Sequence, residues 1–307
     1  MRGQEAVHTV GVGGIPPGED AVTEAYKNML VEHDGQIGRI VLNRPERHNA
    51  LLHEAVYEFP RAIDELTADD DVRVIIMKGA GPSFSAGFDW KVVERPGRSE
   101  DAAHEVLVGR EWLHGLFKIW DTPKPVIAQL HGYAAGWGSL PLLFCDLKYA
   151  APDFKVFKAA GVTGAYLGEV WAWFIGATAA KEFTFRPANK LTADELYTYG
   201  LLNRIYPQDD LETRVEEIAA EIATAHPLFL QFQKLGLNRQ VDFRGFRESV
   251  LQAKDFDAML HWSVLGRANM VRLKNLGGDR RKLADEQQDA EAYWKAREEE
   301  PQTRGQW

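Results

Sequence analysis

Gly81-Pro-Ser-Phe-Ser-Ala-Gly-Phe-Asp-Trp90 and His131-Gly-Tyr-Ala-Ala-Gly-Trp-Gly-Ser-Leu140 are the two stretches that decide the fold of this 307-residue chain. Each follows an apolar run that predicts a buried strand, over Val72–Met77 and over Pro125–Leu130. Each then turns through glycines into an expected helix start, where backbone N–H groups lack acceptors within the helix. Two such N–H groups directed at one point can stabilise a developing negative charge, as an oxyanion hole does.

Hydrophobic periodicity around the two glycine turns predicts alternating strands and helices. The predicted strands include Ile37–Leu42 and Leu142–Tyr149, and the predicted helices include His53–Leu66, Ala103–Trp120 and an aromatic helix over Val170–Ala180. A β-α-β alternation implies parallel strands joined by right-handed crossovers. From Thr192 onward the pattern is almost entirely helical. We therefore expect an α/β core followed by a helical region.

The chain divides into four expected parts. Residues 1–25 are Gly-rich and aperiodic, which is typical of an N-terminal arm. Residues 26–200 form the expected α/β core with the two glycine turns, and residues 201–275 form a helical C-terminal region. Residues 276–307 are highly charged and are expected to form a surface tail.

Composition excludes several classes of protein. Hydrophobic residues make up 45% of the chain and charged residues 26%, as in ordinary globular proteins. The net charge of -9 argues against a nucleic-acid partner, which needs clustered Lys and Arg. A single cysteine, Cys145, allows no intramolecular disulfide and fits the reducing cytoplasm. We find no apolar stretch near the ~20 residues of a membrane span and no spacing typical of a metal site.

The order and spacing of the two glycine turns resemble those of the crotonase (enoyl-CoA hydratase/isomerase) superfamily, from about Tyr26 to about Leu265. Leu42-Asn-Arg-Pro-Glu-Arg-His-Asn-Ala-Leu51 looks like the first segment that contacts coenzyme A in this family. Cys145-Asp146 follows the second turn at the usual distance. The resemblance implies a spiral of ββα units followed by a C-terminal helical trimerisation region, and a homotrimer or a dimer of trimers.

The resemblance also implies the chemistry of the site. The backbone N–H groups of Phe88 and Trp137 would polarise the carbonyl of an acyl-CoA thioester, with Trp137 replacing a glycine of the family's turn. Coenzyme A would enter as part of the substrate, and no cofactor would be bound permanently. The residues expected to bind the coenzyme A portion are Arg44, Arg47, Ala86 and Lys91.

Two glutamates that family hydratases use to place a water molecule are missing here. Leu140 stands at the first position, and Ala160 or Phe157 stands at the second, depending on the alignment. We therefore do not expect a standard two-glutamate hydratase. Glu169 is the best substitute, near where isomerase and dehalogenase relatives place an aspartate. Aromatic neighbours would desolvate its carboxylate and raise its pKa, which suits a general base.

Further residues have weaker assignments. His131 and Tyr166 are possible catalytic groups, although a hydrogen-bonded structural role is favoured for His131 and packing for Tyr166. Asp89 is expected to hold its own loop by hydrogen bonds. The expected substrate pocket is lined by Trp90, Tyr133, Leu140, Phe157 and Ala160.

Three functions fit these residues. The first is an enzyme that isomerises or hydrolyses an acyl-CoA thioester through an enolate or a tetrahedral intermediate. The second is an enzyme of the same fold that hydrolyses a C–C bond of a free β-diketone, without coenzyme A. The third is a non-catalytic acyl-CoA binder, in which bulky side chains line an apolar pocket.

Overall fold

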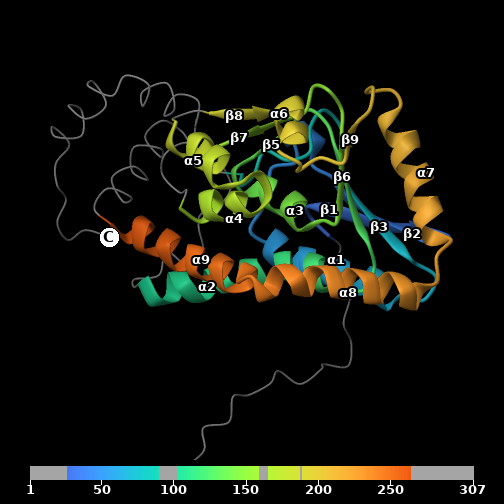
Figure 1. Ribbon diagram of the computed structural model, residues 1–307, viewed down its shortest axis with the longest axis horizontal. Helices are drawn as coiled ribbons and strands as arrows, with labels where there is room; N and C mark the ends of the chain where they lie inside the picture. The colour runs from blue at the N-terminus through green and yellow to red at the C-terminus, as the bar shows by residue number, and fades with distance from the viewer. Residues whose placement is uncertain (1–25, 90–101, 159–164, 187–188, 264–307) are drawn as a thin grey trace, which may run out of the picture.

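A six-stranded sheet forms the centre of the computed structural model, which describes residues 26–89, 102–158, 165–186 and 189–263 (Figure 1). Its strand order is β1-β2-β3-β4-β6-β9. The strands are β1 (Met29–Asp34), β2 (Ile37–Leu42), β3 (Val74–Gly79), β4 (Val126–Leu130), β6 (Leu147–Ala150) and β9 (Arg204–Ile205). β1 and β2 pair antiparallel, and all the other pairs of this sheet are parallel.

A second, smaller sheet has the strand order β5-β7-β8. Its strands are β5 (Tyr133–Ala135), β7 (Lys155–Phe157) and β8 (Lys190–Thr192). β5 and β7 are parallel, and β7 and β8 are antiparallel. β5 follows β4 after His131 and Gly132, and the turn that carries Trp137 follows β5 directly.

Helices cover both faces of the large sheet. They are α1 (Ala55–Ala68), α2 (Ala102–Asp121), α3 (Leu140–Phe144), α4 (Ala165–Ile175), α5 (Ala177–Phe185), α6 (Ala193–Thr198), α7 (Leu211–Ala223), α8 (Pro227–Phe243) and α9 (Phe246–Trp262). Alternate residues of β3 point to opposite faces, so that Val74 and Ile76 pack with α7 while Ile75 and Met77 pack in the main core with α1 and α2.

The last two helices run along the outside of the molecule (Figure 1). α9 packs on α2 and α4, and α8 makes fewer contacts. α8 is fastened by the buried Lys234, whose Nζ lies 2.7 Å from Asp146 Oδ2 and also donates to two backbone carbonyl groups. No helix of the described residues is long and apolar enough to cross a membrane.

The predicted α/β core with following helices is confirmed, with local differences. The strand predicted over Leu142–Tyr149 is wrong, because its first half forms α3 and only Leu147–Ala150 is extended. The aromatic helix over Val170–Ala180 is divided into α4 and α5 at Gly176, whose φ of +79° ends the first helix. The expected boundary between the α/β core and the helical region lies at residue 200. β9 and α7 come after it in the sequence, yet β9 pairs with β6 of the large sheet and α7 packs on that sheet. The arm and the tail lie outside the described residues.

Candidate active site

The two glycine turns lie side by side. The Ser85 amide donates to the Tyr133 carbonyl at 3.1 Å, and the Ala135 amide donates to the Ser85 carbonyl at 2.9 Å. These bonds form a parallel bridge between Ser85 and Ala134. The chain segments that lead to Phe88 and Trp137 are therefore held together by backbone hydrogen bonds.

Two glycines bring the backbones of the turns into direct contact. A Cβ atom added at Gly138 would lie 2.7 Å from the Gly87 nitrogen, and one added at Gly87 would lie 3.4 Å from the Trp137 nitrogen. Side chains at these positions would push the turns apart. Gly87 also has a φ of +78°, which other residues rarely adopt.

Each proposed N–H donor has a favourable local setting. The Asp89 amide donates to the Leu51 carbonyl, and the Leu51 amide donates to the Gly87 carbonyl, so that the Phe88 amide between them points away from Leu51. Trp137 lies in the short 3₁₀ turn Gly136–Ser139, which leads directly into α3. The first amides of such a helical segment lack acceptors within it.

Trp137 fits the turn without backbone strain, although the resemblance implies a glycine at this position. Among the described residues, only His48 and Asn49 have a positive φ without being glycine. Next to Trp137 the left-handed position belongs to Gly136, with a φ of +50°. Trp137 can therefore keep an ordinary backbone conformation.

The side chains of the two turns meet a tryptophan that the sequence did not single out. The Phe88 and Trp137 rings lie 5.6 Å apart between centroids. Trp112 of α2 lies 4.6 Å from Phe88 and 4.5 Å from Trp137, edge-on to both rings. Periodicity indicated that Trp112 is helical, but not which face of the helix meets the site.

A buried ion-pair network holds the residue that follows Phe88. Asp89, which is 3% exposed, accepts hydrogen bonds from Arg44 Nη2 at 3.0 Å and from Arg47 Nη2 at 3.1 Å. Arg44 Nη1 also donates to the Ala50 carbonyl. The expected loop-holding role of Asp89 is thus visible, and its partners are the two arginines predicted to bind coenzyme A. The bond to Asp89 raises the pKa of Arg47.

Other predicted site residues near the turns have structural contacts as well. The Ala86 amide donates to the His48 carbonyl at 2.8 Å. The Tyr133 ring contacts His48 and Phe157, with centroids 5.4 Å and 5.8 Å away. Leu140 is fully buried in the main core rather than open to a pocket.

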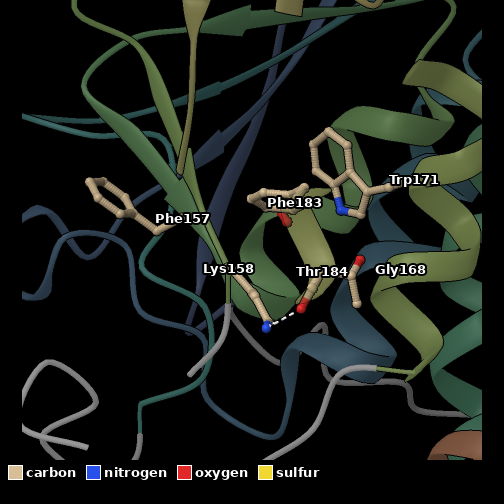
Figure 2. A pocket seen from close by; sticks show the side chains of 7 residues that line it. Phe157, Lys158, Gly168, Trp171, Phe183 and Thr184 are labelled. Carbon is tan, nitrogen blue, oxygen red and sulfur yellow. Dashed lines mark hydrogen bonds between the residues drawn. The ribbon is translucent and has the colours of Figure 1, made fainter. Parts of the chain in front are cut away.

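A small hollow lies beside the end of β7, between Phe157 and α4 (Figure 2). Lys158 reaches into it and donates to the Thr184 carbonyl, while Phe157 points to the other side of the chain. Burial lowers the pKa of Lys158. The remaining lining residues are Ser139, Gly168, Trp171, Phe183 and Thr184.

Glu169 lies on α4 and faces α9. Its Oε2 atom is buried and has no hydrogen-bond partner. Burial, and next the charge of Asp257, raise the pKa of Glu169, as expected for a desolvated carboxylate. Asp257 is itself buried and pairs with Lys254 Nζ at 2.7 Å. The pKa of Glu169 is therefore set by its burial and by a charge on α9, which packs on α4.

The last candidates are placed as follows. His131 is half-buried, and its Nε2 lies 2.7 Å from the Gly81 carbonyl oxygen. This contact joins the first residues of the two glycine-containing segments. Tyr166 belongs to α4, but its side chain lies outside the described part of the chain. Trp90, Lys91 and Ala160 lie outside the described residues. Within those residues, no group of three His, Cys, Asp or Glu side chains could hold a metal ion.

Comparisons with known proteins find relatives that match most of the chain. A family model described as enoyl-CoA hydratase/isomerase matches residues 32–265. A 4-chlorobenzoyl coenzyme A dehalogenase from Arthrobacter is 33% identical over an alignment of 212 residues, and the match covers 66% of this chain and 75% of that protein. The mitochondrial Delta(3,5)-Delta(2,4)-dienoyl-CoA isomerase of Rattus norvegicus is 28% identical, over 82% of this chain and 76% of the isomerase.

A crystal structure of an enoyl-CoA hydratase/isomerase from Xanthobacter autotrophicus Py2 superposes with a TM-score of 0.76 at 27% identity. The match covers 87% of this chain and 99% of that one. The family match spans most of the chain and contains both glycine turns. The chain therefore belongs to the enoyl-CoA hydratase/isomerase family, within the crotonase superfamily.

Proposed function

We propose that this protein is an enzyme that acts on an acyl-CoA thioester, whose carbonyl oxygen accepts hydrogen bonds from the backbone N–H groups of Phe88 and Trp137. The observation that carries this proposal is the direct backbone contact of the two turns at Gly87 and Gly138. An oxyanion hole needs two donors that are fixed before the reaction begins. Relatives whose names include CoA substrates support the thioester as the substrate class.

The reaction we propose is isomerisation or hydrolysis rather than standard hydration. Hydration by two carboxylates needs acidic groups on both sides of one water molecule. Leu140, at the first of these positions, is apolar and fully buried. Glu169 is left as the proposed general base, and its raised pKa supports a role in proton transfer. His131 and Tyr166 stay secondary candidates.

Coenzyme A recognition is proposed for Arg47 and Lys91, with Arg44 and Ala86 beside them. The Arg47 side chain is 37% exposed while it binds Asp89, so part of it faces solvent. Arg44 is only 15% exposed and is more deeply engaged. Trp90, Tyr133, Phe157 and Ala160 complete the proposed substrate pocket.

A second candidate function is hydrolysis of a C–C bond in a free β-diketone. The hydrogen bonds of Arg44 and Arg47 to Asp89 favour it, because arginines that hold a carboxylate have fewer donors for phosphate groups. The same oxyanion hole would then stabilise the enolate that leaves when the C–C bond breaks.

Mass spectrometry of reaction mixtures separates these possibilities. The protein would be incubated in deuterated water with short, long, aromatic and alicyclic CoA thioesters and with free cyclic β-diketones. Release of free coenzyme A, or deuterium uptake into the acyl group, supports the proposal. A thioester whose mass has increased by one water molecule would mean hydration, which contradicts the argument from the two missing glutamates. Cleavage of diketones alone supports the second candidate, and binding without any product indicates an acyl-CoA binder. Glu169→Gln tests the base, since full turnover of this variant would remove Glu169 from the mechanism.

The same family membership leads us to propose a homotrimer or a dimer of trimers in the cytoplasm. α8 and α9 support an interface between copies, because they carry large apolar side chains that are exposed in the single chain. These are Leu228, Phe229, Phe232, Leu235, Leu237, Phe243, Phe256 and Met259. Light scattering should give a trimer or hexamer mass for the wild type and a smaller mass for Phe232→Glu. An unchanged mass in the variant would exclude this face.

A further inference from the structure

Trp112 contacts the side chains of both glycine turns, at Phe88 and at Trp137. It belongs to α2, which packs against α1, α3 and α9. Its ring is at 88° to the Phe88 ring and at 69° to the Trp137 ring, whereas Phe88 and Trp137 are only 34° from each other. Phe88 and Trp137 thus form one wall, and Trp112 forms a second wall that meets it almost at a right angle.

Trp112 is held firmly in this position. It is 9% exposed, and the His53 ring lies 5.8 Å away, in addition to its two partners on the turns. Phe88 and Trp137 are only half-buried. A tryptophan packed edge-on against two other rings cannot move aside without losing both favourable ring contacts.

The position of a bound carbonyl connects these rings to the substrate. A carbonyl oxygen bound by the Phe88 and Trp137 amides lies about 3 Å from both nitrogens. The acyl group attached to that carbonyl therefore begins within reach of the side chains of the same two residues. Any acyl group that extends along this wall meets the Trp112 ring.

We propose that Trp112 is the specificity-determining residue that limits the size of the acyl group. The inference rests on the proposed oxyanion site at Phe88 and Trp137. Compact acyl groups, and flat ones that can lie along the wall, are accepted, whereas long or branched acyl groups collide with the Trp112 ring. A hydrophobic pocket discriminates by about 10-fold or more for each methylene that does not fit.

The experiment measures the preference for long over short acyl thioesters, because a purely structural role of Trp112 would lower binding of all substrates alike and leave this preference unchanged. Dissociation constants and kcat/KM would be determined for acetyl-, hexanoyl-, decanoyl- and benzoyl-CoA and for the matching N-acetylcysteamine thioesters. The variants are Trp112→Ala and Trp112→Phe, the latter in case the former does not fold. Trp120→Phe is the matched control: Trp120 is also on α2 and is 7% exposed, but it packs on Phe144 and Phe246.

We expect the preference for decanoyl over acetyl thioesters to rise about 10-fold or more in Trp112→Ala, to rise less in Trp112→Phe and to stay unchanged in Trp120→Phe. An unchanged ratio in both Trp112 variants, alongside measurable wild-type binding, would overturn this inference alone. An equal change in the Trp120 variant would also overturn it. If the wild type binds none of the thioesters, the proposed function itself fails, and this inference fails with it.

Discussion

Replacing Asp89 by asparagine tests whether the first glycine turn is held by the ion pairs of Asp89 with Arg44 and Arg47. The change keeps the shape of the side chain but removes its charge and one acceptor. Asp89 is 3% exposed and Arg44 is 15% exposed, so the pair is largely shielded from water. Removing one partner of a buried pair leaves the other charge uncompensated, which costs about 3–5 kcal/mol. Because Arg44 keeps its bond to the Ala50 carbonyl, we expect about 3 kcal/mol.

This cost is large enough to measure by thermal unfolding. At about 2.1 cal/mol/K per residue, the 307-residue chain has an unfolding entropy of about 0.64 kcal/mol/K. A loss of 3 kcal/mol therefore lowers the Tm by about 5 °C. Glu217→Gln is the control, because it also turns a carboxylate into an amide but breaks an exposed pair with Arg214 on α7. Its Tm should stay within about 1 °C of the wild type.

The Asp89 variant should also lose activity. Phe88 precedes Asp89 directly, so a loosened turn displaces one of the two proposed oxyanion donors, and loss of one such donor typically lowers kcat about 10²–10³-fold. KM should change much less, because the arginines are still present. A Tm and a kcat both equal to those of the wild type would refute the idea that Asp89 positions this turn.

Three further results are expected. Gly138→Ala should lower kcat about 10²-fold or more, because its Cβ would lie 2.7 Å from the Gly87 nitrogen. Circular dichroism would verify that the variant is folded, and a folded variant with full activity would contradict the close contact of the turns. Burial and Asp257 raise the pKa of Glu169 above its ordinary 4.5, so the folded chain binds a proton more readily than the unfolded chain and loses stability as the pH rises above 4.5. The Tm of Glu169→Gln should therefore rise relative to the wild-type Tm as the pH increases above 4.5, and a constant difference would show that the group is not desolvated. Burial raises the pKa of the Cys145 thiol to about 12, so a thiol reagent should label it at about pH 8 only after unfolding, and fast labelling of native protein would contradict this burial.

The elements that periodicity predicted well are those that bury a whole face. β2, from Ile37 to Leu42, has the predicted bounds, and α2 differs from its prediction by one residue at each end. The prediction of a strand over Leu142–Tyr149 was wrong because a short apolar run has no periodicity that distinguishes a buried helix from a buried strand. β5, β7, β8 and β9 have two or three residues each, which is too short for any pattern to appear.

The site was predictable where it depends on glycine and unpredictable where it depends on helix register. The sequences around Gly87 and Gly138 indicated two turns, and the structure places them in contact. The sequence could not show that Arg44 and Arg47 bond to Asp89, because that pairing depends on how the segment after β2 folds back. Trp112 was missed for a related reason, since α2 follows residues 90–101 and nothing local fixes which of its faces meets the turns.

The most direct test of the oxyanion site is the stretching frequency of the substrate carbonyl in the bound complex. Infrared difference spectra would be recorded with a ¹³C-carbonyl-labelled acyl-CoA that the product screen identifies as a ligand, bound to the wild type and to Gly138→Ala. The account predicts a clear shift to lower frequency in the wild type, because two N–H donors polarise the carbonyl, and a smaller shift in the variant. A carbonyl frequency in the saturated wild-type complex equal to that in water would contradict it.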